Sequence, residues 1–325
     1  MKFAESDLKS YASPLSATEE QQCKNAIAMV RDALKPLGFT DDGKEIHPLY
    51  EDTYAYSLEL RSYTGQRRIK LLVQGSYANN TNIRGKSDVD VAVIQEDIFR
   101  TEYRTYVEPQ KDSDYGFSVA PSPAISFKDE VEKCLRDKFG SDVERKNKSI
   151  KVHGNTYRKD ADTVPCTRYR DYTNDYRKDP ENYIGGIVIY PDHGIPIINF
   201  PEQHIANGKK KNSDTNRYYK KMVRIMKYML YFMQASSYKS AEPMSSFGLE
   251  SLLWNIPNDK FVKYVSYGFI FQDLIEYLKF NTDKLPEFRE ANGIKKLCPN
   301  DESVTEYKEF IRDINAFFEY DYKGK

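Results

Sequence analysis

The sequence predicts an α+β protein in two parts, in which strands and helices alternate up to about residue 205 and helices alone follow. Three observations support this prediction. Short apolar runs of strand character and two amphipathic helical segments precede Phe200. Beyond residue 214 almost every segment has the 3.6-residue period of a helix. The chain has 325 residues, 14% of them aromatic, which is enough to build two domain cores. We therefore expect one domain over 1–205, including an N-terminal helix, and a helical domain over 206–325.

The first part begins with a helix pattern. Ser16 and Glu19 have the spacing of a capping box, and the apolar positions that follow lie on one face. Pro36 and Gly38 end this helix. The other elements expected here are an amphipathic helix over 126–139 and strands over 69–74, 88–94, 150–153, 157–166, 185–190 and 195–200.

The second part begins with a basic segment. Residues 206–214 (Ala-Asn-Gly-Lys-Lys-Lys-Asn-Ser-Asp) are polar, and we expect a loop there. The helices expected beyond it cover about 215–236, 246–255, 259–280 and 302–320.

Charge balance and composition exclude several classes of protein. Lys and Arg together number 49, as do Asp and Glu, whereas a protein that grips duplex DNA usually has a basic excess. No apolar run approaches the roughly 20 residues that span a bilayer, and the polar start lacks a signal-peptide core. The four cysteines have no zinc-ligand spacing, so we expect buried thiols. The expectation is a cytoplasmic protein without a membrane partner and without a need for duplex nucleic acid.

Two carboxylates stand two residues apart at the start of an apolar strand. On a strand, the side chains of Asp88 and Asp90 leave the same face, while Val89 points into the core. Two neighbouring carboxylates repel each other unless a cation lies between them. Mg²⁺ prefers oxygen ligands and keeps places for substrate phosphates. Asp88-Val89-Asp90 is therefore a candidate metal site.

Gly75-Ser76 follows the preceding strand and is expected to open a short helix. A glycine lets a phosphate approach the backbone, and the serine hydroxyl and the free amides at a helix start can donate to it. Each motif is common by chance. Their combination on neighbouring strands predicts a site that binds a metal and a triphosphate.

This arrangement resembles the polymerase-β-like nucleotidyltransferase superfamily, whose pattern is GS, a spacer, DxD and a third acid on a later strand. Asp162, with Pro165 three residues later, is similar to the third acid of the template-independent branch. Asp160 shares its strand face and is the alternative, but the spacing to Pro165 favours Asp162. The resemblance implies a core of a mixed β-sheet flanked by helices. It also implies that Asp88, Asp90 and Asp162 are catalytic and bind metal.

The helical half resembles the second domain of oligoadenylate-synthase and cGAS-type enzymes, through its long helix and the Ser-Ser-Phe segment that opens the next one. In those enzymes a lysine on the long helix and a serine at the next helix contact the donor's phosphates, and an adjacent aromatic stacks on its base. Carried over, these roles fall to Lys227, Ser246 and Phe247, with Ser245 as the alternative serine. The resemblance places the active site in a cleft between the two domains.

Together with the spacer between Gly75 and Asp90, these motifs are most similar to the bacterial cGAS/DncV-like nucleotidyltransferases of anti-phage defence, and within them to the CdnE branch. The resemblance covers about 10–320. It implies a monomer that condenses nucleoside triphosphates into a cyclic di- or oligonucleotide for a downstream effector protein. Two Mg²⁺ ions, or Mn²⁺ as a substitute, would serve the reaction. The nucleotide pair, linkage and ring size do not follow from it.

Two other functions match parts of the sequence. A nucleotidyltransferase of this type could instead modify an RNA 3′ end, a protein or a small molecule. An RNA-tailing enzyme needs a basic track for the strand, and the cluster Lys209-Lys210-Lys211 is short and could equally serve triphosphate. A catalytically silent binding module would lack one acid of the set, whereas all three are present.

Roles in base recognition or in the structure are expected for several further side chains. Base recognition is expected from Thr167, Arg168, Tyr169, Tyr77 and Asn79. The run 168–182 is either an ordered lid or a solvated loop. Structural roles are expected for His153, His193 and His204, which have no carboxylate partner at an informative spacing.

Overall fold

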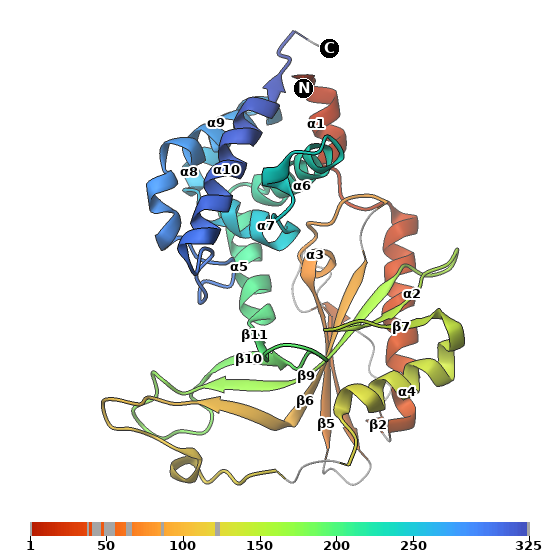
Figure 1. Cartoon of the computed structure of the whole chain (residues 1–325). Helices are drawn as coiled ribbons and strands as arrows, with labels where there is room; N and C mark the ends of the chain where they lie inside the picture. Colours follow the sequence, from red (N-terminus) through yellow and green to blue (C-terminus); the bar gives the residue numbers. More distant parts are fainter. Residues whose placement is uncertain are drawn as a thin grey trace. The chain divides into compact units, whose positions relative to one another are not determined.

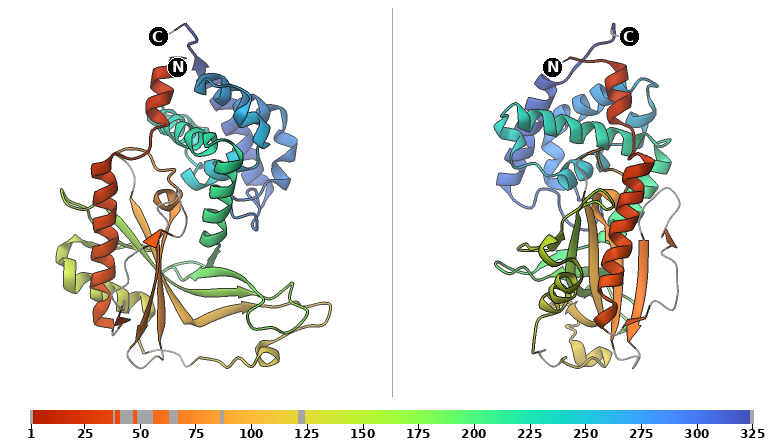
Figure 2. Two further views of the ribbon diagram at one scale, coloured as in Figure 1. Left: turned by 180° about the vertical axis from the view of Figure 1, so that it is seen from behind. Right: turned by 90° about the vertical axis from the view of Figure 1, so that its right-hand side faces the viewer.

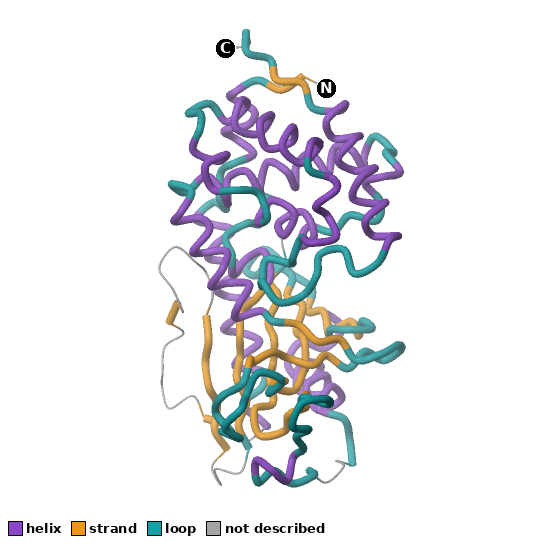
Figure 3. The backbone as a smooth tube through the Cα atoms, turned by 90° about the vertical axis from the view of Figure 1, so that its left-hand side faces the viewer, coloured by secondary structure: helices purple, strands orange, loops and turns teal. Residues whose placement is uncertain are grey.

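The computed structural model describes residues 2–37, 39–40, 47–48, 56–62, 67–85, 88–120 and 124–323. The chain forms two compact units. The sheet unit comprises residues 17–77 and 88–201, and the helical unit comprises residues 1–16, 78–87 and 202–325. Figure 3 colours the strands that dominate the first and the helices that dominate the second. The division into two domains at residue 205 stays a prediction. Gly38, which was expected to help end the first helix, lies outside the described residues, as do Lys86 and Ser87 in the spacer between Gly75 and Asp90.

A mixed β-sheet forms the sheet unit, because β6 and β9 pair in parallel while the other pairs are antiparallel (Figure 1). Its order is β11 (Ile197–Asn199), β10 (Ile184–Ile189), β9 (Ala161–Asp171), β6 (Val89–Glu102), β5 (Arg68–Gln74), β4 (Tyr56–Ser62) and β2 (Phe39–Thr40). The strands off this path are β3 (His47–Pro48), which pairs with β4, β8 (Ile150–Val152), which pairs with β9, and β7 (Val143–Arg145), which pairs with β8.

Two helices cover one face of this sheet (Figures 1 and 2). They are α2 (Ala17–Ala33) and α4 (Phe127–Phe139), and both pack on the central strands. The apolar stripe of α4 is buried through Val131 and Leu135, and its start is fixed by Ser126, whose hydroxyl accepts from the Asp129 amide at 3.1 Å. Such an N-cap stabilises a helix by about 1 kcal/mol. The predicted helices at 16–34 and 126–139 are confirmed.

The central strands run further than the sequence predicts. The expected strand 88–94 continues to Glu102 beyond an irregularity between Gln95 and Phe99, and β9 extends to Asp171 beside it. At this end the strands and their loops share a stack of rings made by Tyr103, Tyr115, Phe117, Tyr172 and Tyr183. In this region aromatic rings pack together in place of the alternating apolar and polar residues that mark a strand in a sequence, so the strand ends were not predicted.

The helical unit is built around α6 (Tyr218–Ala235), most of whose residues are buried. Around it lie α1 (Glu5–Tyr11), α5 (Pro201–Asp214), α7 (Ser246–Trp254), α8 (Asn258–Val262), α9 (Tyr267–Phe280) and α10 (Asp301–Phe317). Short elements elsewhere in the chain are α3 (Gly75–Ala78) and the 3₁₀ turns η1 (Lys35–Leu37), η2 (Asp112–Tyr115), η3 (Gly140–Asp142), η4 (Lys239–Ala241) and η5 (Thr282–Glu287). Among the described residues, no helix combines the length and apolar character that crossing a bilayer requires.

Segments distant in sequence are joined within the helical unit. The terminal strands β1 (Lys2–Phe3) and β12 (Glu319–Tyr320) pair in parallel, so the two ends of the chain lie side by side (Figure 2). Arg224 of α6 donates to the carbonyls of Ala12 and Asn80. Arg224, which is 4% exposed, therefore connects residues from three stretches of the chain.

The expected loop at 206–214 is wrong, because this segment belongs to α5. Its buried positions are Pro201, His204, Ile205, Gly208, Lys211 and Asn212, a spacing of three and four residues. The period is helical, but polar residues occupy half of the buried positions, so hydrophobicity alone does not reveal it. The expected helix 259–280 is broken by residues 263–266 into α8 and α9.

Candidate active site

The predicted carboxylates of the sheet unit lie on adjacent strands. Asp90, the second residue of β6, is the register neighbour of Asp162 on β9. On the other side of β6, Asp90 is opposite Gln74, the last residue of β5. Asp88 immediately precedes β6. Because residues 88 and 90 leave the same face of an extended chain, the three acids named from the sequence face one region at the start of β6 and β9.

Gly75 lies directly against the second of these acids. A Cβ atom added to Gly75 would lie 2.2 Å from Oδ2 of Asp90, and Gly75 has a φ of +70°. Both the contact and the left-handed backbone exclude other residues without rearrangement. Ser76 follows in the short helix α3. The glycine of the GS motif therefore allows the turn after β5 to close onto the Asp90 carboxylate.

A lysine that the sequence did not single out also belongs to this group. Lys151 on β8 is the register neighbour of Asp162, and its Nζ lies 3.0 Å from Oδ2 of Asp88 and 2.7 Å from Oδ2 of Asp160. Asp160 also accepts from the Gly154 amide at 2.6 Å. Asp160 is thus occupied by structural partners, whereas Asp162 is paired in register with Asp90. This geometry favours Asp162 as the third acid.

Electrostatics distinguish Asp162 from its neighbour. Burial raises the pKa of the Asp162 carboxyl, Lys151 opposes this, and the nearby Asp88 carboxylate raises it further. Burial also acts on Asp160, but hydrogen bonds from Lys151 and Gly154 outweigh it and lower its pKa. Asp162 therefore carries a charge that the protein does not fully compensate, and an added cation would do so.

The donor set fits a hard divalent cation, because all three predicted ligands are carboxylates. Within the described part of the chain, no three His, Cys, Asp or Glu side chains are gathered closely enough to form a ready-made metal site. Adjacent carboxylates repel each other, and the Lys151 ammonium neutralises Asp88. The residues are suitable for metal ligation, but their side chains must converge on the ion.

In the helical unit, predicted Lys227 belongs to a buried polar cluster. Its Nζ lies 3.1 Å from Oγ1 of Thr81 and 3.4 Å from Oε2 of Glu250. Thr81 donates to the same Glu250 oxygen at 2.7 Å, and the other Glu250 oxygen lies 2.9 Å from Nε2 of His204. Asn79 contacts the His204 ring. Each of these five residues is at most 6% exposed, so Lys227 is not a solvated lysine on the surface of its helix.

Glu250 is the principal residue of this cluster that the sequence analysis missed. It is the one acid in the apolar helix α7 (Ser-Phe-Gly-Leu-Glu-Ser-Leu-Leu-Trp), and that isolation was the available signal. His204 has a carboxylate partner 46 positions away, a separation that no short-range spacing rule detects.

The serine and aromatic candidates lie at the start of α7. Ser245 is the N-cap, and its Oγ accepts from the Gly248 amide at 2.9 Å. Ser246 is exposed and is the first residue of the helix, so its hydroxyl is not the one that caps α7. Phe247 is 38% exposed and meets the His204 ring edge to face at 5.1 Å. A ring with an exposed face is free to stack on a planar ligand.

Comparison with known proteins identifies the family. A model of the cGAS/DncV-like nucleotidyltransferase C-terminal helical domain matches residues 206–319. The cyclic GMP-AMP synthase CdnE03 of Staphylococcus schleiferi is 47% identical over 321 residues, which cover 98% of each chain. The chain belongs to the cGAS/DncV-like nucleotidyltransferases. It is CdnE-like within them, and it is accordingly an enzyme that transfers nucleotides.

Other members of the cGAS/DncV-like family support this assignment. The cyclic dipyrimidine nucleotide synthase CdnE of Cecembia lonarensis is 33% identical over 91% of this chain and 90% of its own. The solved structure of Elizabethkingia meningoseptica CdnE with GTP and Apcpp has a TM-score of 0.71 at 28% identity, covering 97% of this chain and 99% of its own. The solved structure of Rhodothermus marinus CdnE with Apcpp and Upnpp has a TM-score of 0.73 at 28% identity, covering 96% of each chain. The predicted fold class is confirmed.

The side chains expected to select the base are mostly enclosed. Tyr77 and Asn79 are fully buried, Tyr169 is 5% exposed and packs on Phe200, and Arg168 forms an ion pair with Glu96. Thr167 is half-buried, and its hydroxyl has no hydrogen-bond partner among the residues that the structure describes. Of the five, Thr167 has the most accessible side chain.

The run 168–182 is ordered by one buried acid. Its first four residues belong to β9, and the loop beyond folds around Asp175, which is 1% exposed. Asp175 accepts from the Tyr115 hydroxyl and the Asn182 amide, each at 2.7 Å. Burial alone would raise its pKa, but these bonds and two backbone amides lower it to about 2. The solvated-loop alternative is wrong for this acid, and the lid role stays a prediction.

Proposed function

We propose that the protein condenses nucleoside triphosphates into a cyclic di- or oligonucleotide. The single observation that carries this proposal is the register of Asp90 with Asp162, with Asp88 at the start of the same strand and Gly75 against the Asp90 carboxylate. The relatives whose names are cyclic nucleotide synthases support it. So do solved relatives that contain a nucleotide or its analogues.

The three acids would hold two Mg²⁺ ions, which would neutralise the triphosphate and acidify the attacking hydroxyl. Asp88 and Asp90 would orient the donor. Asp162, whose raised pKa marks a carboxylate short of positive charge, would help bind the acceptor side and receive the hydroxyl proton. The ribose hydroxyl would attack the α-phosphate in line, and pyrophosphate would leave.

The remaining predicted residues would bind the donor nucleotide. Ser76, at the start of α3, and Ser246, at the start of α7, offer hydroxyls to phosphate oxygens. Lys227 would supply positive charge to the triphosphate, and Phe247 would stack on the base through its exposed face. Most of the rate enhancement would come from positioning and charge neutralisation. The linear intermediate would then be re-bound for ring closure.

ATP and GTP are the pair to test first. The S. schleiferi relative is named a cyclic GMP-AMP synthase, but other relatives are named for dipyrimidine, dipurine and UMP-AMP products. Family membership therefore does not fix the bases. We further propose that the product signals to an effector protein in anti-phage defence, and that the enzyme acts as a monomer in the cytoplasm without duplex nucleic acid.

The test uses purified protein, all four labelled nucleoside triphosphates and Mg²⁺. We expect pyrophosphate release and a product that resists alkaline phosphatase, because a closed ring has no terminal phosphate. Asp88→Asn and Asp90→Asn should each lose at least about 100-fold of this activity. Asp97→Asn, an exposed acid on the same strand, is the matched control. A phosphatase-sensitive product, or full activity in either variant, contradicts the proposal.

A further inference from the structure

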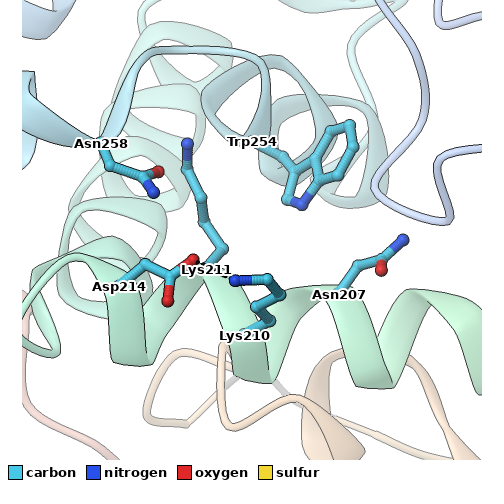
Figure 4. A pocket seen from close by; sticks show the side chains of 6 residues that line it. All are labelled: Asn207, Lys210, Lys211, Asp214, Trp254 and Asn258. Atoms are coloured by element: carbon cyan, nitrogen blue, oxygen red, sulfur yellow. Dashed lines mark hydrogen bonds and ion pairs between the residues drawn. The ribbon is translucent and has the colours of Figure 1, made fainter.

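The basic cluster at 209–211 borders a small cavity in the helical unit. Lys210 and Lys211 lie near the C-terminal end of α5, and the cavity measures about 210 Å³ (Figure 4). It is lined by Asn207, Lys210, Lys211, Asp214, Trp254 and Asn258. The proposed function assigns no role to these residues. The volume is below the roughly 300–1,000 Å³ of sites for drug-sized ligands, so the cavity suits a small occupant.

Lys211 places a buried positive charge in this cavity. The side chain is 9% exposed, donates to the carbonyl of Ile256 and lies over the Phe261 ring. Throughout the described residues, no carboxylate comes within ion-pair distance of its ammonium. Burial lowers the pKa of Lys211 to about 8, while Asp214 and Asp259 oppose this from further away. An ammonium has three donors, so two remain after the bond to Ile256.

Two neighbours of Lys211 also have unused binding capacity. Figure 4 shows the Lys211 side chain rising from α5 toward Asn258 and Trp254. The Asn258 side chain makes no hydrogen bond to any other residue that the structure describes, so its amide can donate to a ligand. The Trp254 indole is half-buried, and a Cβ atom added to Gly293 would lie 3.8 Å from its edge. An indole presents a flat apolar face on which a planar ring can stack.

The charge around the cavity remains positive despite the acid in its lining. Asp214 is paired with Lys210 at 2.7 Å, and these side chains are 36% and 75% exposed. The pair largely cancels its own field, which leaves the Lys211 charge. A phosphate monoester has three terminal oxygens, and it can accept from Lys211 and from Asn258 at once.

We propose that this cavity is a second ligand site, which binds a small phosphomonoester attached to a planar ring, of mononucleotide size or less. Lys211 and Asn258 would hold the phosphate, and Trp254 would stack on the ring. Trp254 and Ser246 occupy opposite ends of α7, a helix of nine residues or about 13 Å. The proposal does not depend on the proposed catalytic function.

The chain offers a direct readout, because Trp254 is its only tryptophan. Adenosine monophosphate is titrated into the full-length protein while tryptophan fluorescence is recorded. We expect a saturable change that persists when a non-hydrolysable ATP analogue and Mg²⁺ saturate the catalytic site. Lys211→Met should weaken binding by at least about tenfold, and Lys209→Met, the same change at a position outside the lining, should not.

Asn258→Ala tests the same phosphate contact if Lys211→Met fails to fold, and it should weaken binding by about fivefold. Adenosine and inorganic phosphate separate the two halves of the ligand, and each should bind more weakly than the monophosphate. The proposal is overturned if the ATP analogue abolishes the signal, or if Asn258→Ala and Lys211→Met bind like the wild type. It is also overturned if adenosine binds as tightly as the monophosphate, or if no saturable change occurs.

Discussion

Replacing Glu250 by glutamine removes one negative charge from the buried cluster of the helical unit while preserving side-chain size. In the wild type, Glu250 is 1% exposed, lies 3.4 Å from the Lys227 ammonium and contacts His204 and Thr81. The substitution removes the Glu250 charge that lies beside the buried Lys227 ammonium. Breaking a buried ion pair from one side costs about 3–5 kcal/mol, so we expect a loss of that size in the free energy of unfolding.

The pKa of Glu250 gives a second measure of the same loss. Burial would raise this pKa, but Lys227 and His204 outweigh it and lower the value from 4.5 to about 2. One pKa unit corresponds to about 1.4 kcal/mol, so the ionised form is stabilised in the folded protein by roughly 3 kcal/mol. Because the folded pKa is depressed, this stabilisation is complete above pH 4.5 and disappears as the pH falls toward 2. The glutamine variant has no such titration.

Urea unfolding followed by Trp254 fluorescence measures this effect, since Trp254 is on the same helix as Glu250. The wild type should exceed Glu250→Gln by about 3 kcal/mol at neutral pH, and the gap should close in the acid range. Glu276→Gln, an exposed acid on α9, should change stability by less than about 0.5 kcal/mol. Adding Lys227→Met to Glu250→Gln should cost less than the sum of the single changes. Equal midpoints for wild type and Glu250→Gln at neutral pH would refute the reasoning.

Three further results are expected in the sheet unit. Gly75→Ala should lower pyrophosphate release by at least about 100-fold, because the added Cβ would displace the Asp90 carboxylate. Unchanged release would contradict this close contact, and circular dichroism would show whether the variant is folded. Lys151→Met should lower the Mg²⁺ concentration for half-maximal activity severalfold, because the Lys151 ammonium, 3.0 Å from Asp88, would no longer compete with Mg²⁺ for this carboxylate. A higher Mg²⁺ requirement in the variant argues against such competition. Asp175→Ala should speed proteolytic cleavage within 172–182 by about tenfold or more, because four hydrogen bonds to this carboxylate are lost, and equal cleavage rates count against its ordering role.

The local part of the fold was accessible from the sequence. The helix expected over 126–139 has an apolar stripe in its sequence, and the structure confirms this helix and adds the Ser126 cap. The strand leading to Gly75 and the acids at 88 and 90 carry their own short-range pattern. Asp162 was named through the family resemblance, and its register with Asp90 comes from the pairing of two strands that are distant in sequence.

The parts that failed depend on tertiary contacts. The helical period of α5 is not visible from hydrophobicity because polar side chains such as His204 and Asn212 fill buried positions. The carboxylate partner of His204, Glu250, is distant in sequence. Lys151 joins the carboxylates only because β8 pairs with β9. Arg168, which was expected to read a base, forms an ion pair with Glu96 on the neighbouring strand β6. A single sequence contains no signal for such pairings.

The hydrogen bonds that Arg224 donates to two early segments of the chain affect the order in which the protein folds during synthesis on the ribosome. Its two acceptors, Ala12 and Asn80, emerge long before α6. The sheet unit can pack once residue 201 has emerged, whereas the helical unit waits for its last helix. Nascent chains generally fold domain by domain from the N-terminus, but here the first stretch to emerge is among the last to be packed. A recombinant fragment limited to 202–325 would lack both early segments. Arg224 would lose the Ala12 and Asn80 carbonyls and Glu250 would lose the Thr81 hydroxyl, so we expect the fragment to be unstable.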